Sequence, residues 1–183
     1  MQKIRVGVVR GGPSSEYAIS LKTGENVLRN LDTEKYAPID ILLTTRGEWY
    51  MNGVRMDLGT IAERADVIWN ALHGSFGEDG KVQQLFESFG IPYTGSGVLS
   101  SAIGMHKELA KERFREAGLL TPYGNLISTE GNFGEVILQR FQHGHLPVMV
   151  KPVSGGSSVG MTLAYTFDDL EAAVKTARRQ GDV

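Results

Sequence analysis

The sequence predicts an α/β protein in which an open parallel sheet is followed by a second, α+β unit. In the first half of the chain, apolar runs typical of buried strands alternate with helical patterns, and glycine-rich polar loops follow the strands. Beyond Gly97 this alternation stops. With 183 residues, of which 41% are hydrophobic, the chain is long enough to bury one large core or two small ones. We therefore expect domains at residues 1–97 and 98–183.

The N-terminal half is expected to alternate strands with helices. Its predicted strands are Ile4–Val9, Ile39–Thr44, Val67–Leu72 and a short one at Ile91–Thr94. Its predicted helices are about Ser15–Asn30, a turn near Ile61–Ala65, and one that carries Val82, Leu85, Phe86 and Phe89 and is closed by Gly90. Open α/β sheets bind ligands at the carboxyl ends of their strands, where the loops "RGGPSSE" and "HGSFGEDG" are expected.

The second half has a different order of elements. We expect helices at about Val98–Met105, Lys107–Ala117 and Phe133–Gln142, a strand near Leu126, and two strands around "VKPVSGGSSVG". A last helix should begin at Thr166, because Thr166 and Asp169 have the spacing of a capping box.

Composition excludes several classes of protein. The net charge of −2 and the scattered basic residues do not favour nucleic acid or an anionic membrane as a partner. The absence of cysteine excludes a disulfide framework and a Cys-based zinc site. The N-terminus lacks the pattern of a signal peptide and no apolar run has transmembrane length, so we expect a soluble cytoplasmic protein. His143 and His145 have no carboxylate or cysteine partners, and we assign no metal ligands.

The segment "VMVKPVSGGSSVG" is a candidate phosphate site. Pro152 restrains Lys151 to an extended conformation, so that the lysine projects from a fixed place at the end of a strand. The glycines allow backbone N–H groups to approach a ligand, and the serines add hydroxyl donors; these residues are Gly155, Gly156, Ser157, Ser158 and Gly160. A lysine with backbone amides suits a triphosphate. The alternative is a plain surface hairpin, and the spacing alone slightly favours that alternative.

The first two loops carry candidate substrate-binding residues. Glu16 lies in the first turn of a predicted helix, where the helix dipole alone stabilises a carboxylate by about 0.3–1 kcal/mol. Its functional interpretation is contact with the ammonium group of a small substrate. His73 follows a buried strand at the same edge of the sheet and is expected to face a crevice. We interpret Glu78 and Asp79 as structural residues that orient the His73 loop.

The stretches "GGPSSEYAIS", "NALHGSFGEDGKVQQLFESFGIPYTGSGVLSSAIGMHK", "GLLTP" and "VMVKPVSGGSSVGM" together closely resemble the D-alanine-D-alanine ligases, an ATP-grasp family. The resemblance implies a Rossmann-like pre-ATP-grasp domain followed by the central ATP-grasp subdomain. It also implies that the C-terminal ATP-grasp domain is absent, so that this chain is a truncated form with little or no ligase activity by itself.

The resemblance further implies an activity and a set of site residues. In this family ATP phosphorylates one D-alanine, and the amine of a second attacks the acyl phosphate to form the D-alanyl-D-alanine of peptidoglycan. Glu16 would bind the ammonium of the first D-alanine, and His73 would lie beside its carboxylate. The residues at the ATP phosphates would be Lys107, Lys151, Gly156, Ser157 and Ser158, with Ser157 also linked to Glu16.

The family pattern leaves some points open. In this chain His106 stands before Lys107, where the family usually has an acid or asparagine. Tyr17-Ala18 follows Glu16, where the family has a more polar stretch. The ligands of Mg²⁺ (or Mn²⁺) would lie outside this chain. A homodimer through the N-terminal domain is expected. The alternatives are a non-catalytic, dimerising or ligand-binding fragment, and a ligase that uses D-lactate or D-serine as its second substrate.

Overall fold

A computed structural model describes residues 2–128, 133–143, 146–156 and 159–180. The chain divides into two compact units, Met1–Ala102 and Ile103–Val183, and each is described by itself. The boundary lies inside helix α4 (Val98–Met105). The division into domains at residues 97 and 98 stays a prediction. None of the described helices has the length and apolarity that a membrane span requires.

The first unit is built on one mixed sheet. Its strands are β1 (Ile4–Gly11), β2 (Tyr36–Leu43), β3 (Trp49–Met51), β4 (Val54–Arg55) and β5 (Val67–Asn70), in the order β4-β3-β2-β1-β5. β1 is parallel to β2 and β5, whereas β3 is antiparallel to β2 and β4. The prediction of an open parallel sheet is therefore correct only for β2, β1 and β5.

The antiparallel edge follows from a short connection. Between β2 and β3 the chain reverses in a tight turn, in which Thr44 N–H donates to the Glu48 carbonyl at 2.9 Å and Gly47 N–H donates to the Thr44 carbonyl at 3.1 Å. So short a turn can join only antiparallel strands, since a parallel pair needs a crossover of a dozen or more residues. The predicted strand Ile91–Thr94 is reduced to one bridge, between Tyr93 and Ile68.

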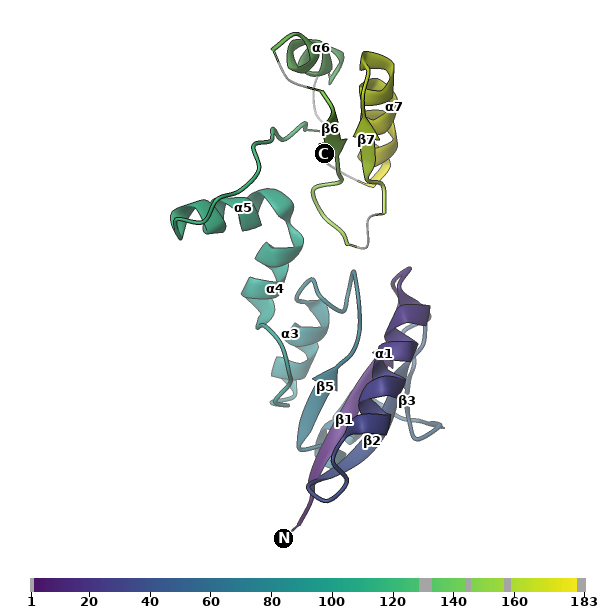
Figure 1. Ribbon diagram of the computed structural model, residues 1–183. Coiled ribbons are helices and arrows are strands. Elements are labelled where there is room, and N and C mark those ends of the chain that lie inside the picture. Colours follow the sequence, from purple (N-terminus) through teal and green to yellow (C-terminus); the bar gives the residue numbers. More distant parts are fainter. Residues whose placement is uncertain (1, 129–132, 144–145, 157–158, 181–183) are drawn as a thin grey trace. The chain divides into compact units, whose positions relative to one another are not determined.

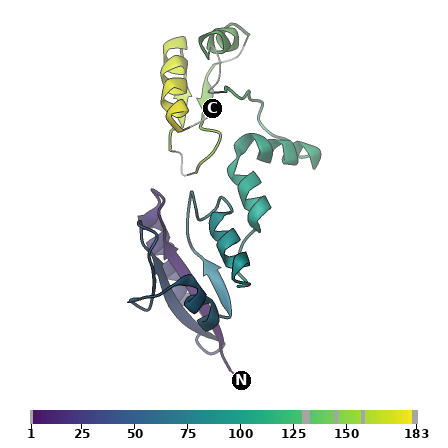
Figure 2. The ribbon, with the colours of Figure 1, turned by 180° about the vertical axis from the view of Figure 1, so that it is seen from behind.

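Helices cover both faces of this sheet. Helix α1 (Tyr17–Asn30) packs Val27 and Leu28 against Val6 and Val8 of β1, and Figure 1 shows it in front of the strands. Helices α2 (Leu58–Arg64) and α3 (Lys81–Ser88) contribute to the larger core on the opposite face, which Figure 2 turns toward the reader. That core includes Val9, Ile41, Leu43, Ile61, Ile68, Val82 and Phe86. Both faces of β1 are thus buried from Val6 to Val9, as its apolar sequence predicts. β2 buries only Ile41 and Leu43, and Trp69 of β5 is 39% exposed.

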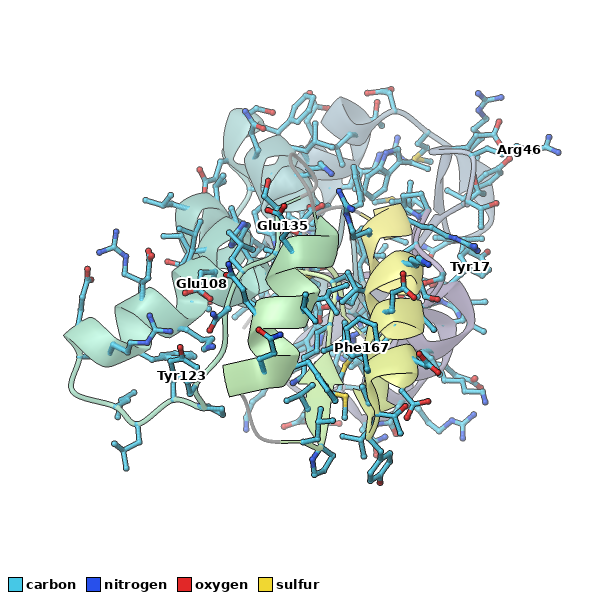
Figure 3. The ribbon with its side chains drawn as sticks, turned by 90° about the horizontal axis from the view of Figure 1, so that it is seen from above. Tyr17, Arg46, Glu108, Tyr123, Glu135 and Phe167 are labelled. Carbon is cyan, nitrogen blue, oxygen red and sulfur yellow. The ribbon has the colours of Figure 1, made fainter. Side chains whose placement is uncertain are left out.

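The described residues of the second unit form a two-stranded sheet and, after α4, four helical segments. After the end of α4 come α5 (Lys107–Glu116), α6 (Phe133–His143), β6 (Val148–Val150), β7 (Thr162–Ala164), α7 (Phe167–Ala177) and a short 3₁₀ turn (Arg178–Gln180). A small core joins α6 and α7 to the sheet through Ile137, Val150, Ala164 and Val174, among others. In Figure 3 α6 and α7 lie side by side. Between them the rings of Phe167 and Phe141 pack edge to face, with their centroids 5.4 Å apart.

Two predictions about this unit have opposite outcomes. The capping box of α7 is confirmed, since Thr166 Oγ1 accepts from Asp169 N–H at 3.2 Å and the Asp169 carboxylate accepts from Thr166 N–H at 3.1 Å. The strand near Leu126 is wrong. The described residues 119–128 form no strand and Leu126 is 46% exposed, because no neighbouring strand offers these residues backbone partners.

Candidate functional site

In the first unit, two loops meet at the carboxyl end of the sheet. Ser14 joins them: its hydroxyl donates to the His73 carbonyl at 2.7 Å and accepts from Glu16 N–H at 3.1 Å. Ser14 is buried, so both bonds are formed away from bulk water, where an unmade bond is costly. One side chain therefore fixes the backbone on both sides of the candidate site.

Glu16 lies against the loop that carries His73. A Cβ atom built on Gly74 would be only 2.6 Å from Glu16 Oε2, and Gly74 has φ +70°. A side chain at position 74 would be both strained and in collision with the carboxylate. Glycine at this position thus lets the half-buried Glu16 carboxylate approach the backbone immediately after His73.

The His73 ring has a partner at each nitrogen. Nε2 is 2.9 Å from Thr23 Oγ1 on α1, and Nδ1 is 3.5 Å from Glu78 Oε1. The other oxygen of Glu78 accepts from Gly74 N–H at 2.7 Å. The prediction that Glu78 orients the His73 loop is confirmed by this bond, and the same carboxylate also lies near the ring.

Side chains from β5 and α3 hold the rest of the "HGSFGEDG" loop in place. Asn70 and Gln83 both donate to the Gly77 carbonyl, at 3.0 and 2.9 Å. Phe76 has φ +71°, which is unusual for a bulky residue and marks a loop that its surroundings constrain. Although burial opposes it, hydrogen bonds from Phe76 and Lys81 lower the pKa of Asp79. Asp79 is therefore a structural anion within this loop, as predicted.

Two hydroxyl residues of α1 were missed by the sequence analysis. Ser20 is fully buried, accepts from Gly11 N–H at 2.8 Å and donates to the Ala71 carbonyl at 2.7 Å. Thr23, three residues later, is the partner of His73. The available signal was the spacing of Ser20, which is seven and eight residues before Val27 and Leu28 and so lies on the face of the helix that packs against the sheet.

In the second unit, Lys107 and Lys151 lie close to each other. Lys107 begins α5, its N–H donates to the Val153 carbonyl at 2.9 Å, and its ammonium donates to the Gly155 carbonyl at 2.8 Å. Burial lowers the pKa of the Lys107 ammonium below its ordinary 10.5, and the positive charge of Lys151 lowers it further. Lys151 directly follows β6 rather than completing it, and is exposed. Two cations beside a glycine-rich loop provide charge for an anion.

The loop between β6 and β7 is described only in part. Ser154 forms an isolated bridge with His106, and Gly155 and Gly156 are exposed. His106 caps α5, because its Nδ1 accepts from Leu109 N–H at 3.3 Å. Ser157 and Ser158 lie outside the described residues, and so does the expected link from Ser157 to Glu16.

The described side chains do not supply a metal centre. No group of three or more His, Cys, Asp or Glu residues among them is placed to hold a metal ion. The donor set therefore does not fit Mg²⁺, and we derive no step through a metal.

The fold and these groups define a class of protein. The first unit is an α/β unit with a carboxylate and an imidazole on adjoining loops at the carboxyl end of its parallel strands, where such sheets take small ligands. The second pairs two lysines with a glycine-rich loop, a donor set typical of phosphate-binding proteins. The class is that of α/β proteins with one candidate site for a small polar molecule and one candidate site for an anion.

Comparison with known proteins identifies the family. The model of the D-ala D-ala ligase N-terminus matches residues 5–61 and 54–96, and that of the D-ala D-ala ligase C-terminus matches residues 114–182. The chain belongs to the D-alanine-D-alanine ligase family. It is 36% identical to the D-alanine-D-alanine ligase of Mycolicibacterium gilvum, an alignment that covers 97% of this chain and 58% of that protein.

Solved structures agree with this assignment. The D-alanine-D-alanine ligase of Coxiella burnetii has a TM-score of 0.88 at 29% identity, over 98% of this chain and 62% of that one. The Bacillus anthracis enzyme complexed with ATP has a TM-score of 0.78 at 37% identity, over 98% and 56%. The chain thus spans less than two thirds of the length of these relatives.

Proposed function

We propose that this chain acts in the ATP-dependent ligation of two D-alanine molecules to D-alanyl-D-alanine, with release of ADP and phosphate. The observation that carries the proposal is the contact between the loop of Glu16 and the loop of His73. Both loops lie within the residues that match the family's N-terminal model. Ser14 ties the loop of Glu16 to the loop of His73, so a carboxylate and an imidazole are held at one edge of the sheet. A zwitterionic amino acid presents the complementary charges to such a pair.

The proposed roles in the first unit follow from charge. Glu16 binds the ammonium of the first D-alanine through a charge-assisted hydrogen bond. His73 lies beside the carboxylate of that molecule. The proposed contribution of both residues is to bind and orient the substrate, since this chemistry depends on positioning more than on a protein nucleophile.

The proposed roles in the second unit concern ATP. Lys107 and Lys151, together with the backbone of Gly156 and the hydroxyls of Ser157 and Ser158, hold its phosphates. Support comes from the two neighbouring ammonium groups. Burial lowers the pKa of Lys107 and the positive charge of Lys151 lowers it further, and a bound polyanion would relieve this repulsion. A solved relative 37% identical to this chain is described as complexed with ATP.

Calorimetry on the chain tests both sets of roles. Glu16→Gln should weaken D-alanine binding about tenfold or more and leave ATP binding unchanged, because a hydrogen bond to a charged group contributes roughly 1.5–3 kcal/mol. Lys151→Met should do the reverse. The matched controls are Glu25→Gln, which removes an exposed carboxylate paired with Arg29 on the same helix, and Lys175→Met on α7. Equal loss in a variant and its control would contradict the proposed roles.

A second candidate is a non-catalytic module that binds the same ligands and forms a homodimer. Phosphate release with ATP, Mg²⁺ and D-alanine bears on both candidates. Release that requires both ATP and D-alanine supports the ligase and contradicts the expected lack of activity, whereas binding without release fits both the module and a truncated ligase. Parallel reactions with D-serine and D-lactate address the second substrate. The D-serine reaction is worth including because the VanG D-Ala:D-Ser ligase of Enterococcus faecalis has a TM-score of 0.83 at 28% identity.

A further inference from the structure

We propose that Thr23 is a positioning residue that holds the orientation of the His73 ring and, together with Glu78, stabilises its Nδ1–H tautomer. The inference rests on the proposed function, in which His73 meets the carboxylate of D-alanine. Thr23 lies on α1, away from both candidate loops in sequence, and its hydroxyl is 2.9 Å from His73 Nε2. Both residues are half-buried, so water competes with this bond only in part.

The tautomer follows from the second partner of the ring. An ionised carboxylate only accepts hydrogen bonds, so Glu78 favours the proton on Nδ1, which faces Glu78 Oε1 at 3.5 Å. Glu78 cannot turn away freely, because its other oxygen accepts from Gly74 N–H at 2.7 Å. In the neutral ring Nε2 is then an acceptor, and the Thr23 hydroxyl donates to it.

A hydroxyl has a property that a fixed donor or acceptor lacks. It can donate to Nε2 of the neutral ring and, after rotation, accept from Nε2–H of the protonated ring. Thr23 therefore keeps the imidazole in place in either protonation state.

The first arm of the test reads the ring directly. In ¹⁵N-histidine-labelled protein above pH 8, we expect signals of the Nδ1–H tautomer for His73. Thr23→Val keeps the shape of the side chain and removes the hydroxyl, and should shift these signals toward an average of the two tautomers. Thr23→Ala, which suits a helix better, provides a second variant, and Thr23→Ser should restore the wild-type signals.

A matched control separates the hydroxyl from the helix. Thr176→Val makes the same change in α7, where the threonine hydroxyl donates to the Ala172 carbonyl, and should leave the His73 signals in place. Unchanged ring signals in both Thr23→Val and Thr23→Ala would overturn the proposal, and so would an equal shift in Thr176→Val.

The second arm measures ligand binding. Thr23→Val should weaken D-alanine binding about three- to tenfold and leave ATP binding unchanged, whereas Thr23→Ser should stay within about twofold of the wild type. Unchanged D-alanine binding in a variant whose ring signals have shifted would overturn the role toward substrate. If the wild-type chain does not bind D-alanine, the proposed function fails, and the ring signals still decide whether Thr23 positions His73.

Discussion

The pKa of Lys107 depends in part on a neighbouring charge. Its pKa is lowered first by burial and then by the positive charge of Lys151. Removal of that charge in Lys151→Met should therefore raise the pKa of Lys107 toward 10.5, because one of the two causes disappears. The measurement is a titration of the Lys107 ammonium by NMR. Lys175→Met, which removes an exposed lysine paired with Glu171, should have no effect, and a fall in the pKa of Lys107 in Lys151→Met would contradict the argument.

Single residues differ in how far the sequence reveals them. Glu16 and His73 could be nominated because each follows a recognisable strand or begins a helix, and the carboxyl edge of a parallel sheet is where ligands bind. His73 lies after β5 as that reasoning predicts, whereas Glu16 is the N-cap residue that precedes α1 and does not lie in its first turn. The roles of both residues stay predictions. Thr23 could not be nominated, because a hydroxyl on a helix gives no periodic signal and its partner lies 50 residues away.

A substitution at Gly24 in α1 tests whether close packing or helix propensity has the larger effect on stability. A Cβ at Gly24 would lie 2.5 Å from Arg10 Cβ, and Arg10 is held by two hydrogen bonds of 2.7 Å to Asp40. Gly24→Ala gains about 1 kcal/mol of helix propensity and loses about 1–3 kcal/mol through overpacking. We expect a net loss of about 1 kcal/mol in the free energy of unfolding, measured with urea.

Gly104 provides the matched control for Gly24. It also lies inside a helix, and among the described residues a Cβ there would meet no atom within 4 Å. Gly104→Ala should therefore be neutral or stabilise the chain by up to about 1 kcal/mol. Equal changes in stability for the two variants would show that packing against Arg10 does not control this helix.

Element bounds were predictable where burial gives a strong pattern. Helices α4, α5 and α6 and the cap of α7 fall where periodicity, glycine and threonine place them. Strands β3 and β4 were missed because they have three and two residues, too few for a period of two to be recognised. The strand predicted near Leu126 is wrong for a different reason. An apolar residue suggested a strand, but a strand also needs a neighbouring strand to pair its backbone groups.

At the scale of the whole molecule, the two units have separate cores. The core residues of the first unit lie between Val6 and Tyr93, and those of the second lie between Ile127 and Ala177. We therefore expect residues 1–102 to fold by themselves and to unfold in one cooperative transition. Both tryptophans of the chain, Trp49 and Trp69, belong to this unit, so their fluorescence reports on it alone.

Unfolding in urea is followed by tryptophan fluorescence. We expect the same urea midpoint for residues 1–102 and for the full chain. A large difference in midpoint would mean that the second unit stabilises the first, and the absence of a transition would mean that the first unit does not fold alone. The sequence predicted two units because its pattern changes beyond Gly97. It could not fix the boundary, because α4 carries the chain from one unit into the other without a break.

The buried hydroxyl of Ser20 determines where α1 can lie along the sheet. It bonds Gly11 at the end of β1 and Ala71 just after β5, and a shift of the helix by one residue would break both bonds. Glu16 is four residues before Ser20 and Thr23 is three residues after it, within about one turn on either side. One buried hydroxyl thereby sets the height and rotation at which a carboxylate and a second hydroxyl reach the His73 loop.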